Sequence, residues 1–485
     1  MNWEARKGNT MTQALAGAAG VSRRNLLGGA AAVGGAFALA QGCSNPNSGP
    51  AGKKVIVVGG GLAGCIAARE LAHRGYQVTL LEAQGRLGGR TFTGEFAGKK
   101  AELGALMLSW GQPFMWAEVT RYNLEIEPIV GALTPEICYW IADGQSHQGT
   151  ADTFFSLFGA AVKEFFKDAL TAFPYPYEPL KNLEVVRELD KLSCADRLAT
   201  MSNPVTRDLA DNWASAPLGR RGRDAGLAPS MALTSAFGGV DASLAGASYR
   251  LKDGTSILTK KISEDGKYEV KLGSIVSKID QNGSSVKVTV GGGATYEADA
   301  VLVAVPANTY ANIAFSPQIA QGKLEVAKGR MAGGKGPHIN ARIKGKMPAI
   351  MAVAPSDMPL HLLLTTDILE DSFIVDGYGP DSATLDGNDK SAVQAAIRNW
   401  IPDAEVLETI AYRWDLDPFA QGTWCGYGPG VLTKYFDDLR KAEGKVFFAT
   451  ADSASAFRGF MEGAAESGVR VSRDMHEFLS GKAEG

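Results

Sequence analysis

The distribution of apolar and polar positions along the chain predicts an α/β fold. Val55–Val58 and Val78–Leu81 are short apolar runs, as expected of strands that are buried on both faces. A helical pattern lies between them. Ala300–Val305 reads as another strand, and Pro306 ends it because proline cannot continue a strand ladder. We therefore expect a parallel sheet assembled from segments that lie far apart in the sequence.

The region between these strands reads differently. Residues 106–230 are mainly helical in pattern, with amphipathic stretches at Phe154–Phe173 and Leu189–Met201. The basic, glycine-rich segment 216–226 reads as an exposed loop. Nothing in this region repeats the pattern of the first strands, so we assign it to a second domain.

Strand patterns return in the second half of the chain. Ile275–Ile279 and Val286–Val290 flank Asn282-Gly283, a typical hairpin turn. The other predicted elements are strands at Ile339–Ile343, Ile350–Val353 and Leu360–Thr365 and helices at Ala392–Trp400 and Gly463–Leu479.

Three glycines after the first strand have the spacing G-x-G-x-x-G, namely Gly59, Gly61 and Gly64. The first permits a tight turn, the second lets the backbone approach a pyrophosphate, and the third allows close helix–strand packing. The free N–H groups of the helix N-terminus would face that pyrophosphate. The second strand ends at Glu82, whose carboxylate can accept the hydrogen bonds of an adenosine ribose and would repel a 2′-phosphate. This favours FAD or NAD over NADP.

The segment Arg86–Thr91 distinguishes between these two cofactors. It reads Arg-Leu-Gly-Gly-Arg-Thr, which is unusual for a plain loop. Its backbone and its guanidinium groups can close over a second phosphate or over the polar edge of a flavin. The segment therefore favours FAD.

Composition limits the other classes of function. The 485 residues are 45% apolar and 21% charged, with a net charge of −3, enough for two or three domains with ample core. There is no long basic run, so nucleic acid is not an expected partner. The five cysteines and five histidines show no metal-binding spacing, and no metal site is expected.

Residues 1–43 have the pattern of a twin-arginine export signal. An arginine pair at positions 23–24 precedes the weakly apolar stretch Leu26–Ala40, which ends in an A-x-A cleavage pattern. Such a route suits a protein that loads its cofactor before export, and it predicts a periplasmic location. Cys43 leaves a lipoprotein open as an alternative, and residues 44–52 read as a polar linker.

These motifs and others near the C-terminus resemble the flavin-containing amine oxidase family, which includes monoamine oxidases and L-amino-acid oxidases. The segments that carry the resemblance are Leu81–Ala83, Arg86, Gly88–Arg90, Glu102–Ala105, Phe448–Asp452, Gly459–Ala464 and Glu466–Gly468. Within the family, Gly88–Phe96, Trp116–Leu124 and Pro306–Lys323 are most similar to the branch that oxidises nicotine and pseudooxynicotine. The resemblance covers nearly the whole chain after residue 51.

The resemblance implies a Rossmann-type FAD-binding domain of the glutathione-reductase kind and a mixed α+β substrate-binding domain. The first would comprise residues 53–105, 233–309 and 417–485, and the second residues 106–232 and 310–416. The residues implied to bind FAD are Gly59, Gly61, Ala63, Gly64, Glu82, Gly89, Arg90, Gly104, Ala105, Val276, Asp452 and Met461. Neither Thr423 nor Cys425 aligns convincingly with the cysteine that carries the flavin in some members, so we expect non-covalent FAD.

The resemblance also points to catalytic positions. Members of the family place two aromatic rings beside the flavin, and the matching residues are Trp424 and Phe460. Such rings exclude water and attract an electron-poor nitrogen. Many relatives carry a lysine just before a strand of the substrate domain. Here His338 occupies that position and Lys335 lies three residues earlier, so either residue could take the role, and a purely structural histidine stays open.

The sequence thus predicts an FAD enzyme that oxidises a C–N bond of a secondary or other amine, of the nicotine or pseudooxynicotine kind. Hydride would pass to the flavin, and the imine product would then be hydrolysed. The electron acceptor would be O2 or a periplasmic protein such as cytochrome c, and a homodimer is left open. Two alternatives remain at this stage: a flavin desaturase or dehydrogenase acting on C–C or C–O bonds, and a non-catalytic flavoprotein of the same fold.

Overall fold

A computed structural model of the protein describes residues 52–481. The predicted export signal and all but the last residue of the predicted linker lie outside the described residues. No helix among residues 52–481 is long and apolar enough to cross a membrane.

The predicted parallel sheet is present and has five strands. Its centre is β1 (Lys54–Val58), which pairs in parallel with β2 (Gln77–Leu81) on one side and β13 (Ala300–Val303) on the other. The outer strands are β9 (Glu269–Lys271) and β20 (Val446–Phe448). Strands separated by almost four hundred positions therefore share one sheet, which confirms the expected assembly from distant segments.

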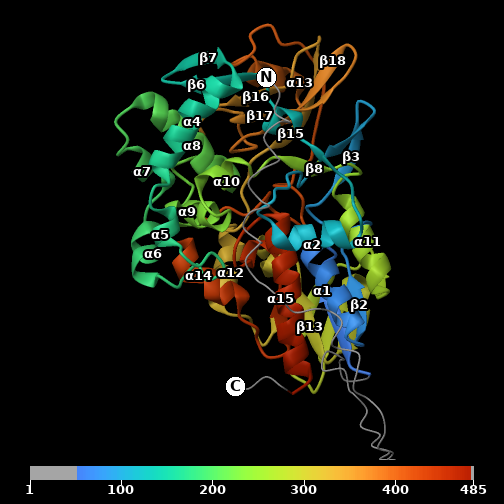
Figure 1. The fold of residues 1–485 in the computed structure, drawn as a ribbon. Coiled ribbons are helices and arrows are strands. Elements are labelled where there is room, and N and C mark those ends of the chain that lie inside the picture. The colour runs from blue at the N-terminus through green and yellow to red at the C-terminus, as the bar shows by residue number, and fades with distance from the viewer. Residues whose placement is uncertain (1–51, 482–485) are drawn as a thin grey trace, which may run out of the picture. The chain divides into compact units, whose positions relative to one another are not determined.

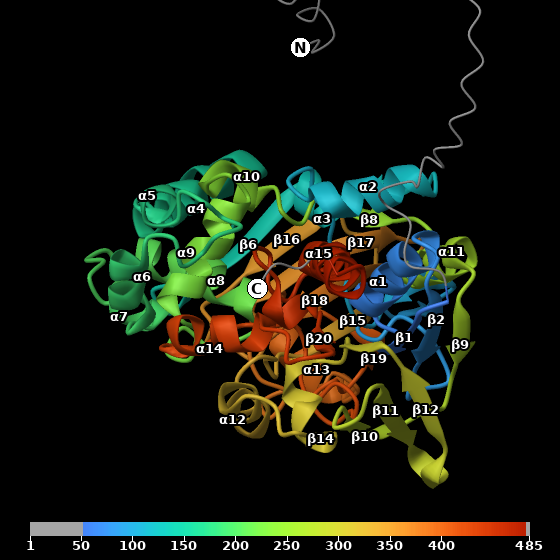
Figure 2. The ribbon, with the colours of Figure 1, turned by 90° about the horizontal axis from the view of Figure 1, so that it is seen from below.

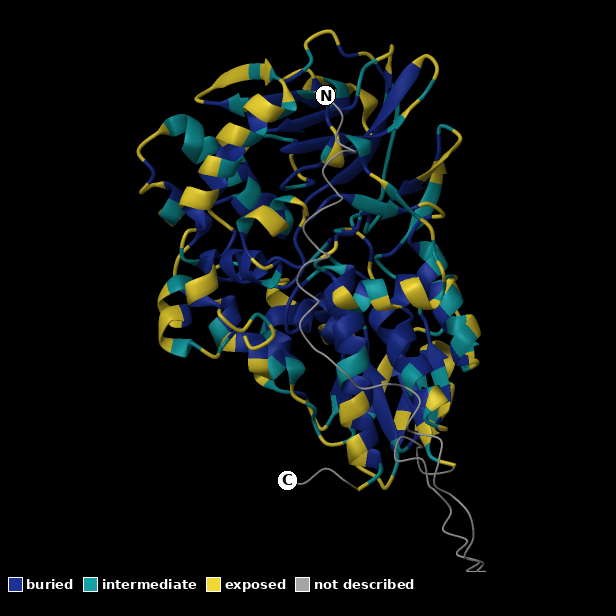
Figure 3. Ribbon diagram, viewed as in Figure 1, coloured by how far each residue is buried: buried dark blue, intermediate teal, exposed yellow. Residues whose placement is uncertain are grey.

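Two helices pack together beside this sheet, as both ribbon views show (Figures 1 and 2). They are α1 (Leu62–His73), which follows the glycine turn, and α15 (Met461–Leu479) near the C-terminus. Gly468 of α15 lies so close to α1 that a Cβ there would be 2.6 Å from the carbonyl oxygen of Ala63. The small residue lets the two backbones approach, and both helices bury most of their residues in the core (Figure 3).

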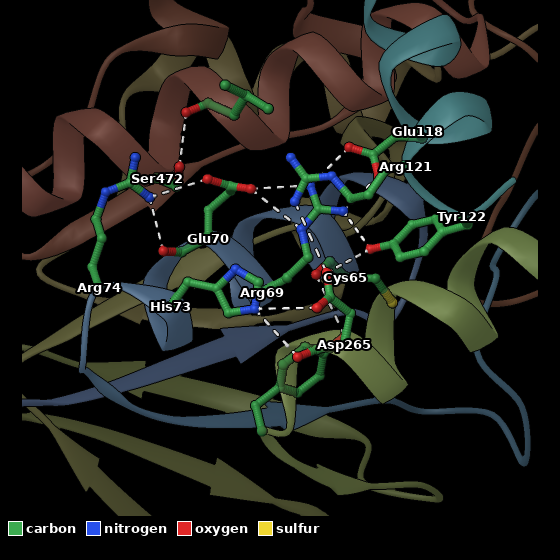
Figure 4. Close-up of polar contacts among 12 residues, drawn as sticks. Cys65, Arg69, Glu70, His73, Arg74, Glu118, Arg121, Tyr122, Asp265 and Ser472 are labelled. Carbon is green, nitrogen blue, oxygen red and sulfur yellow. Dashed lines mark hydrogen bonds and ion pairs between the residues drawn. The ribbon is translucent and has the colours of Figure 1, made fainter. Parts of the chain in front are cut away.

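A buried arginine ties α1 to its neighbours (Figure 4). Arg69 donates to both carboxylate oxygens of Glu118 on α2 (Pro113–Arg121), at 2.5 and 2.7 Å, and both side chains are almost fully buried. Arg69 also donates to the hydroxyl of Tyr122 at 2.6 Å, and Tyr122 donates to Asp265 at the end of α11 (Ser256–Gly266). The network fixes α1, and with it the glycine turn, relative to two other helices.

A second, seven-stranded sheet carries the predicted strands of the second domain. Its order is β19-β15-β18-β17-β16-β6-β7. The strands are β6 (Ile137–Ala142), β7 (Gln145–Gly149), β15 (His338–Lys344), β16 (Ile350–Val353), β17 (Leu362–Ile368), β18 (Ser372–Tyr378) and β19 (Val406–Ala411). One face packs against α13 (Lys390–Ile397), and the other face contributes to the core shared with α4 (Ala151–Phe165) and α8 (Pro204–Ser215).

The region expected to be mainly helical also contains the β6–β7 hairpin of this sheet, which the sequence pattern missed. Its helices are α2, described above, α3 (Val130–Leu133), α4 (Ala151–Phe165), α5 (Ala169–Ala172), α6 (Leu183–Asp190), α7 (Cys194–Leu198), α8 (Pro204–Ser215) and the first part of α9 (Leu227–Ala236); α10 (Val240–Leu244) follows it. The stretch Leu189–Met201 is not one helix, because Ser193 forms a capping box with Asp196 and starts a new helix there.

The expectation of an exposed loop at residues 216–226 was wrong for most of its length. Leu218, Gly222 and Ala225 are buried, and only residues 223–224 are exposed. The backbone N–H of Gly222 donates to the hydroxyl of Ser356 at 2.7 Å, which holds the segment against the loop between β16 and β17. The arginines and glycines of this segment suggested that it is exposed to solvent, but its glycines allow close packing instead.

The predicted hairpin around Asn282-Gly283 is confirmed, within a small four-stranded sheet. Its strands are β10 (Val276–Asp280), β11 (Val286–Val290), β12 (Thr295–Ala298) and β14 (Ala314–Ser316). The remaining elements are β3 (Thr93–Phe96), β4 (Lys99–Glu102), β5 (Ile126–Pro128), β8 (Tyr249–Leu251), α12 (Gln321–Gly329) and α14 (Val431–Arg440). The domain boundaries given above stay a prediction.

Candidate active site

The glycine turn after β1 has the geometry that a dinucleotide requires. Gly59 has a φ of +104°, and a Cβ there would lie 2.7 Å from the carbonyl oxygen of Ala304. A Cβ at Gly64 would lie 2.1 Å from the carbonyl oxygen of Gly59, so each position needs glycine for packing. The nearest atom to a Cβ placed at Gly61 would be the carbonyl oxygen of Gly88, 4.0 Å away. The space above Gly61 is therefore open, as an approaching pyrophosphate needs.

A cavity of about 250 Å³ extends from this turn across the carboxyl ends of the strands. It is lined by the predicted residues Gly59, Gly61, Ala63, Glu82, Gly89, Arg90, Ala105, Val276 and Met461. Gly64 lies beneath the turn instead. We refer to this space as the cofactor cavity.

Glu82 is held at the end of β2 with its carboxylate facing backbone donors. Its two oxygens accept from the N–H groups of Gly60 at 2.6 Å and Gln84 at 2.7 Å. Burial raises the pKa of Glu82, and these N–H groups act in the opposite direction. A carboxylate oxygen that accepts one hydrogen bond can accept another, so a ribose hydroxyl can still donate to it.

Arg90 is fixed between two distant segments. Its guanidinium donates to the carbonyl oxygen of Thr423 and to the carboxylate of Asp452, both at 2.8 Å. The other oxygen of Asp452 accepts from the N–H of Ala307. Asp452 was predicted to bind the cofactor, but it lines neither of the cavities described here, and its contacts orient Arg90 instead.

The residues of this cavity fit FAD, with open space at Gly61, an acidic ribose contact at Glu82 and the helix N-terminus at Met461. None of the four cysteines in residues 52–481 lines the cofactor cavity or the second cavity described next.

A second cavity, of about 170 Å³, adjoins the cofactor cavity. The residues common to both are Arg90, Ala105, Trp414, Gly459, Phe460 and Met461. The lining of the second cavity is mostly apolar, with aromatic rings from Trp213, Phe237, Tyr378, Trp414, Trp424 and Phe460. We call it the substrate cavity.

Trp424 and Phe460, the predicted ring pair, both line the substrate cavity and are half-buried. Trp424 meets the ring of Tyr378 edge-on at 5.7 Å, and Phe460 meets that of Phe237 at 6.2 Å. Gly459 brings their segments together, because its φ is +85° and a Cβ there would be 2.4 Å from the N atom of Cys425. The ring pair is therefore held by backbone packing that only glycine permits.

The structure separates the two residues considered for the family's lysine position. His338 is buried and lies on the wall of the substrate cavity, whereas Lys335 is exposed and lines neither cavity. His338 also contacts Asp376 through its Nε2 atom, at 2.5 Å. The cavity wall thus has a histidine–carboxylate pair at His338, the position that the resemblance matches to the lysine of many relatives.

Several residues of the substrate cavity were not predicted, among them Phe237, Tyr378 and Trp414. One signal was available for Asp376 behind the wall, because β18 is an otherwise apolar strand in which every residue is buried. A carboxylate inside such a strand needs a partner.

The first turn of α15 is tied to α2 by Glu462. Its carboxylate is fully buried and accepts from the N–H groups of Phe114 at 3.0 Å and Met115 at 2.8 Å. Burial and, to a smaller extent, Glu466 together raise the pKa of Glu462 to about 7, against the effect of these N–H groups.

Because the folded protein holds the proton of Glu462 more tightly than the unfolded chain does, this group stabilises the fold below about pH 4.5 and the contribution is lost as the pH rises through about 7. As the pH rises from about 4.5 to about 7, the free energy of unfolding of the wild type should fall by roughly 3 kcal/mol relative to that of Glu462→Gln. Urea denaturation at several pH values measures it. Glu477→Gln, at an exposed position of the same helix, is the control. If the free energy of unfolding changed with pH equally in Glu462→Gln and in the wild type, the expectation would be contradicted.

Comparison with known proteins gives two family matches. A model described as flavin containing amine oxidoreductase matches residues 62–336 and 372–476, and one described as pyridine nucleotide-disulphide oxidoreductase matches residues 12–103.

Individual proteins with known names are similar over nearly the whole chain. Pseudooxynicotine dehydrogenase of a Pseudomonas species is 37% identical, over 96% of this chain and 97% of the relative. Nicotine dehydrogenase of Pseudomonas putida is 34% identical, over 95% and 98%. Among solved structures, putrescine oxidase bound to putrescine has a TM-score of 0.76 at 20% identity, over 87% of this chain and 98% of its own. Cyclohexylamine oxidase from Brevibacterium oxydans has a TM-score of 0.75 at 19% identity, over 88% of this chain and 99% of its own. At these identities the structures show the shared fold.

Proposed function

The chain belongs to the family of flavin-containing amine oxidoreductases, and from that premise we propose that it oxidises a secondary or tertiary amine of the pseudooxynicotine or nicotine kind. It is an FAD-dependent oxidoreductase that acts on amines. The observation that carries the finer proposal is the aromatic substrate cavity, which opens onto the cofactor cavity at Phe460 and Met461. The names of the two most similar relatives described above support the substrate class.

Bound FAD would accept a hydride from the carbon next to the amine nitrogen, and the resulting imine would hydrolyse in water. The chain's own residues bind and orient. Arg90 and the N-terminus of α15 hold the polar parts of the cofactor. Trp424, Phe460 and Phe237 exclude water and fix the amine in one orientation.

The charge of the substrate cavity favours a monoamine with an apolar body. None of the described residues that line it is an aspartate or a glutamate, and its charged or titratable wall residues are Arg90, His338 and Tyr378. A diamine would place its second ammonium group in this apolar space without a carboxylate partner, which is costly. An aromatic ring such as pyridine would instead pack against the tryptophans.

The substrate proposal is tested by steady-state kinetics with four amines: pseudooxynicotine, nicotine, putrescine and cyclohexylamine. We expect kcat/KM for one of the two pyridine amines to exceed that for putrescine by at least about a hundredfold, the gain of a well-filled apolar site. Mass spectrometry should show the deaminated carbonyl compound or its imine precursor. Preferred turnover of putrescine would contradict the proposal.

Replacing Trp424 with alanine removes one wall of the substrate cavity and should slow reduction of the flavin by amine about a hundredfold, because the amine loses its orientation. Stopped-flow absorbance measures the rate. Trp110→Ala is the control, since that tryptophan is 66% exposed and lines neither cavity. A rate within threefold of the wild type would count against the role of Trp424.

We further propose export through the twin-arginine route and an electron acceptor other than O2, such as a periplasmic c-type cytochrome. The export pattern in residues 1–43 supports the first, and the histidine in place of the flavin-adjacent lysine supports the second. Cell fractionation of the double variant Arg23→Lys, Arg24→Lys tests export, which should fail in this variant.

Mixing the reduced enzyme with O2 and, separately, with oxidised cytochrome c tests the identity of the electron acceptor. Faster reoxidation of the flavin by O2 than by cytochrome c would contradict the proposed acceptor.

A further inference from the structure

His338 and Asp376 lie on neighbouring strands and face the same side of the seven-stranded sheet. In the antiparallel register of β15 and β18, His338 is opposite Tyr378 and Asn340 is opposite Asp376. Alternate residues of a strand share a face, so His338, Tyr378 and Asp376 all lie on the face that carries the substrate cavity. This placement follows from sheet register and not from a local loop.

The pair is tightly packed. The Nε2 atom of His338 lies 2.5 Å from Oδ1 of Asp376, and the two side chains are 2% and 1% exposed. The ring of Tyr378 stacks on the imidazole with 4.6 Å between centroids and 12° between planes. The imidazole therefore has one fixed orientation.

That orientation leaves one ring nitrogen for the cavity. Nδ1 of His338 is buried and makes no hydrogen bond that meets normal geometry, and His338 lines the substrate cavity. The carbonyl of Gly104, which lines the same cavity, also acts on the ring, but no hydrogen bond of normal geometry satisfies Nδ1. A buried polar atom left so is costly and rare, and on a cavity wall it points to a ligand. Because Nε2 is occupied by Asp376, Nδ1 is the atom that can face the bound substrate.

The charged surroundings of the ring are dominated by carboxylates. Asp376 lies on β18, and the buried Glu102 lies at the end of β4, where Thr255 and Thr93 donate to its carboxylate. Arg90 lines the same cavity but is paired with Asp452. Burial, the largest single cause, lowers the pKa of His338, but Asp376, Glu102 and the carbonyl of Gly104 together outweigh it, and the pKa is raised overall.

We propose that Asp376 is a positioning residue that holds His338 as an imidazolium with its Nδ1–H toward the substrate cavity, which gives the cavity a fixed positive charge. This inference rests on the proposed function and deepens it. A cation on a dry wall disfavours a second cation nearby, so the cavity takes the amine in its neutral form. The neutral amine keeps the nitrogen lone pair that assists departure of a hydride from the neighbouring carbon.

The first test measures the protonation state of His338 directly, without substrate. The FAD-loaded enzyme is labelled at its five histidine rings and titrated by NMR, and the signal lost in His338→Gln identifies the residue. We expect an imidazolium at pH 7 in the wild type and a pKa lower by about 1 to 3 units in Asp376→Asn, the usual effect of losing a close carboxylate. A neutral His338 at pH 7 in the wild type overturns the proposal, even if Asp376→Asn does not fold.

The second test follows the apparent Kd of an amine substrate during anaerobic flavin reduction between pH 6 and pH 9. In the wild type the apparent Kd should fall about tenfold per pH unit below the pKa of the amine, as binding of the neutral form requires. The dependence of the apparent Kd on pH should be weaker in Asp376→Asn. It should be unchanged in the control Asp371→Asn, whose side chain directly precedes β18 and is 74% exposed. An unchanged dependence in Asp376→Asn overturns the inference. If no amine reduces the wild-type flavin, the proposed function fails, while the NMR titration still decides on the pair.

Discussion

Replacing Gly61 with valine is expected to weaken FAD binding by at least about a thousandfold, roughly 4 kcal/mol, while the protein stays folded. No atom lies within 4 Å of the position where a Cβ would stand except the carbonyl oxygen of Gly88 at 4.0 Å, so the fold has room for a side chain. That room is the space in which the backbone must approach a pyrophosphate. The Kd of FAD for the apoprotein, measured by quenching of flavin fluorescence, gives the effect.

Gly85→Ala serves as the matched control for Gly61→Val. Gly85 is an exposed glycine close in sequence, and a Cβ there would meet no atom within 4 Å. It lines neither cavity, so its replacement should leave the affinity for FAD unchanged. If Gly61→Val bound FAD as tightly as the wild type, the pyrophosphate would not lie at this turn.

Replacing Arg69 with methionine is expected to lower the free energy of unfolding by about 3 to 5 kcal/mol. The substitution leaves the carboxylate of Glu118, which is 4% exposed, without its charged partner in the core. It also removes the hydrogen bond to Tyr122 that links α1 to α11 (Figure 4). Urea denaturation of the apoprotein at constant pH measures the loss.

A double variant separates the cost of an unpaired charge from the cost of a lost contact. Arg69→Met combined with Glu118→Leu removes both charges and should recover much of the stability, because buried ion pairs contribute little net over apolar pairs. If Arg69→Met alone lay within 1 kcal/mol of the wild type, the pair would not anchor α1 as described.

The parts of the site that the sequence predicted correctly depend on local patterns. The turn at Gly59, Gly61 and Gly64 follows from spacing within six residues, and the strands beside it follow from short apolar runs. The helix predicted at Gly463–Leu479 likewise follows from a local pattern, and α15 begins two residues before it, at Met461. Such features are set by neighbours in the sequence, so a single chain reveals them.

The parts that could not be predicted depend on contacts between distant segments. His338 and Asp376 are 38 positions apart, and only the register of β15 against β18 brings them together. Asp452 lies in a segment that resembles a cofactor-binding motif, yet its carboxylate accepts hydrogen bonds from Arg90 and from the N–H of Ala307. Segment 216–226 had the composition of a loop, but the packing around Gly222 buries most of it.

If bound FAD and the aromatic substrate cavity together oxidise an amine, the flavin must be reduced by that amine alone. Anaerobic mixing of the FAD-loaded protein with a panel of amines measures this, because bleaching of the oxidised flavin reports hydride transfer without any acceptor. We predict bleaching by a secondary or tertiary amine with a pyridine ring, with one carbonyl product formed per flavin reduced. Bleaching by alkene or alcohol compounds but by no amine, or by no compound at all, would contradict the account.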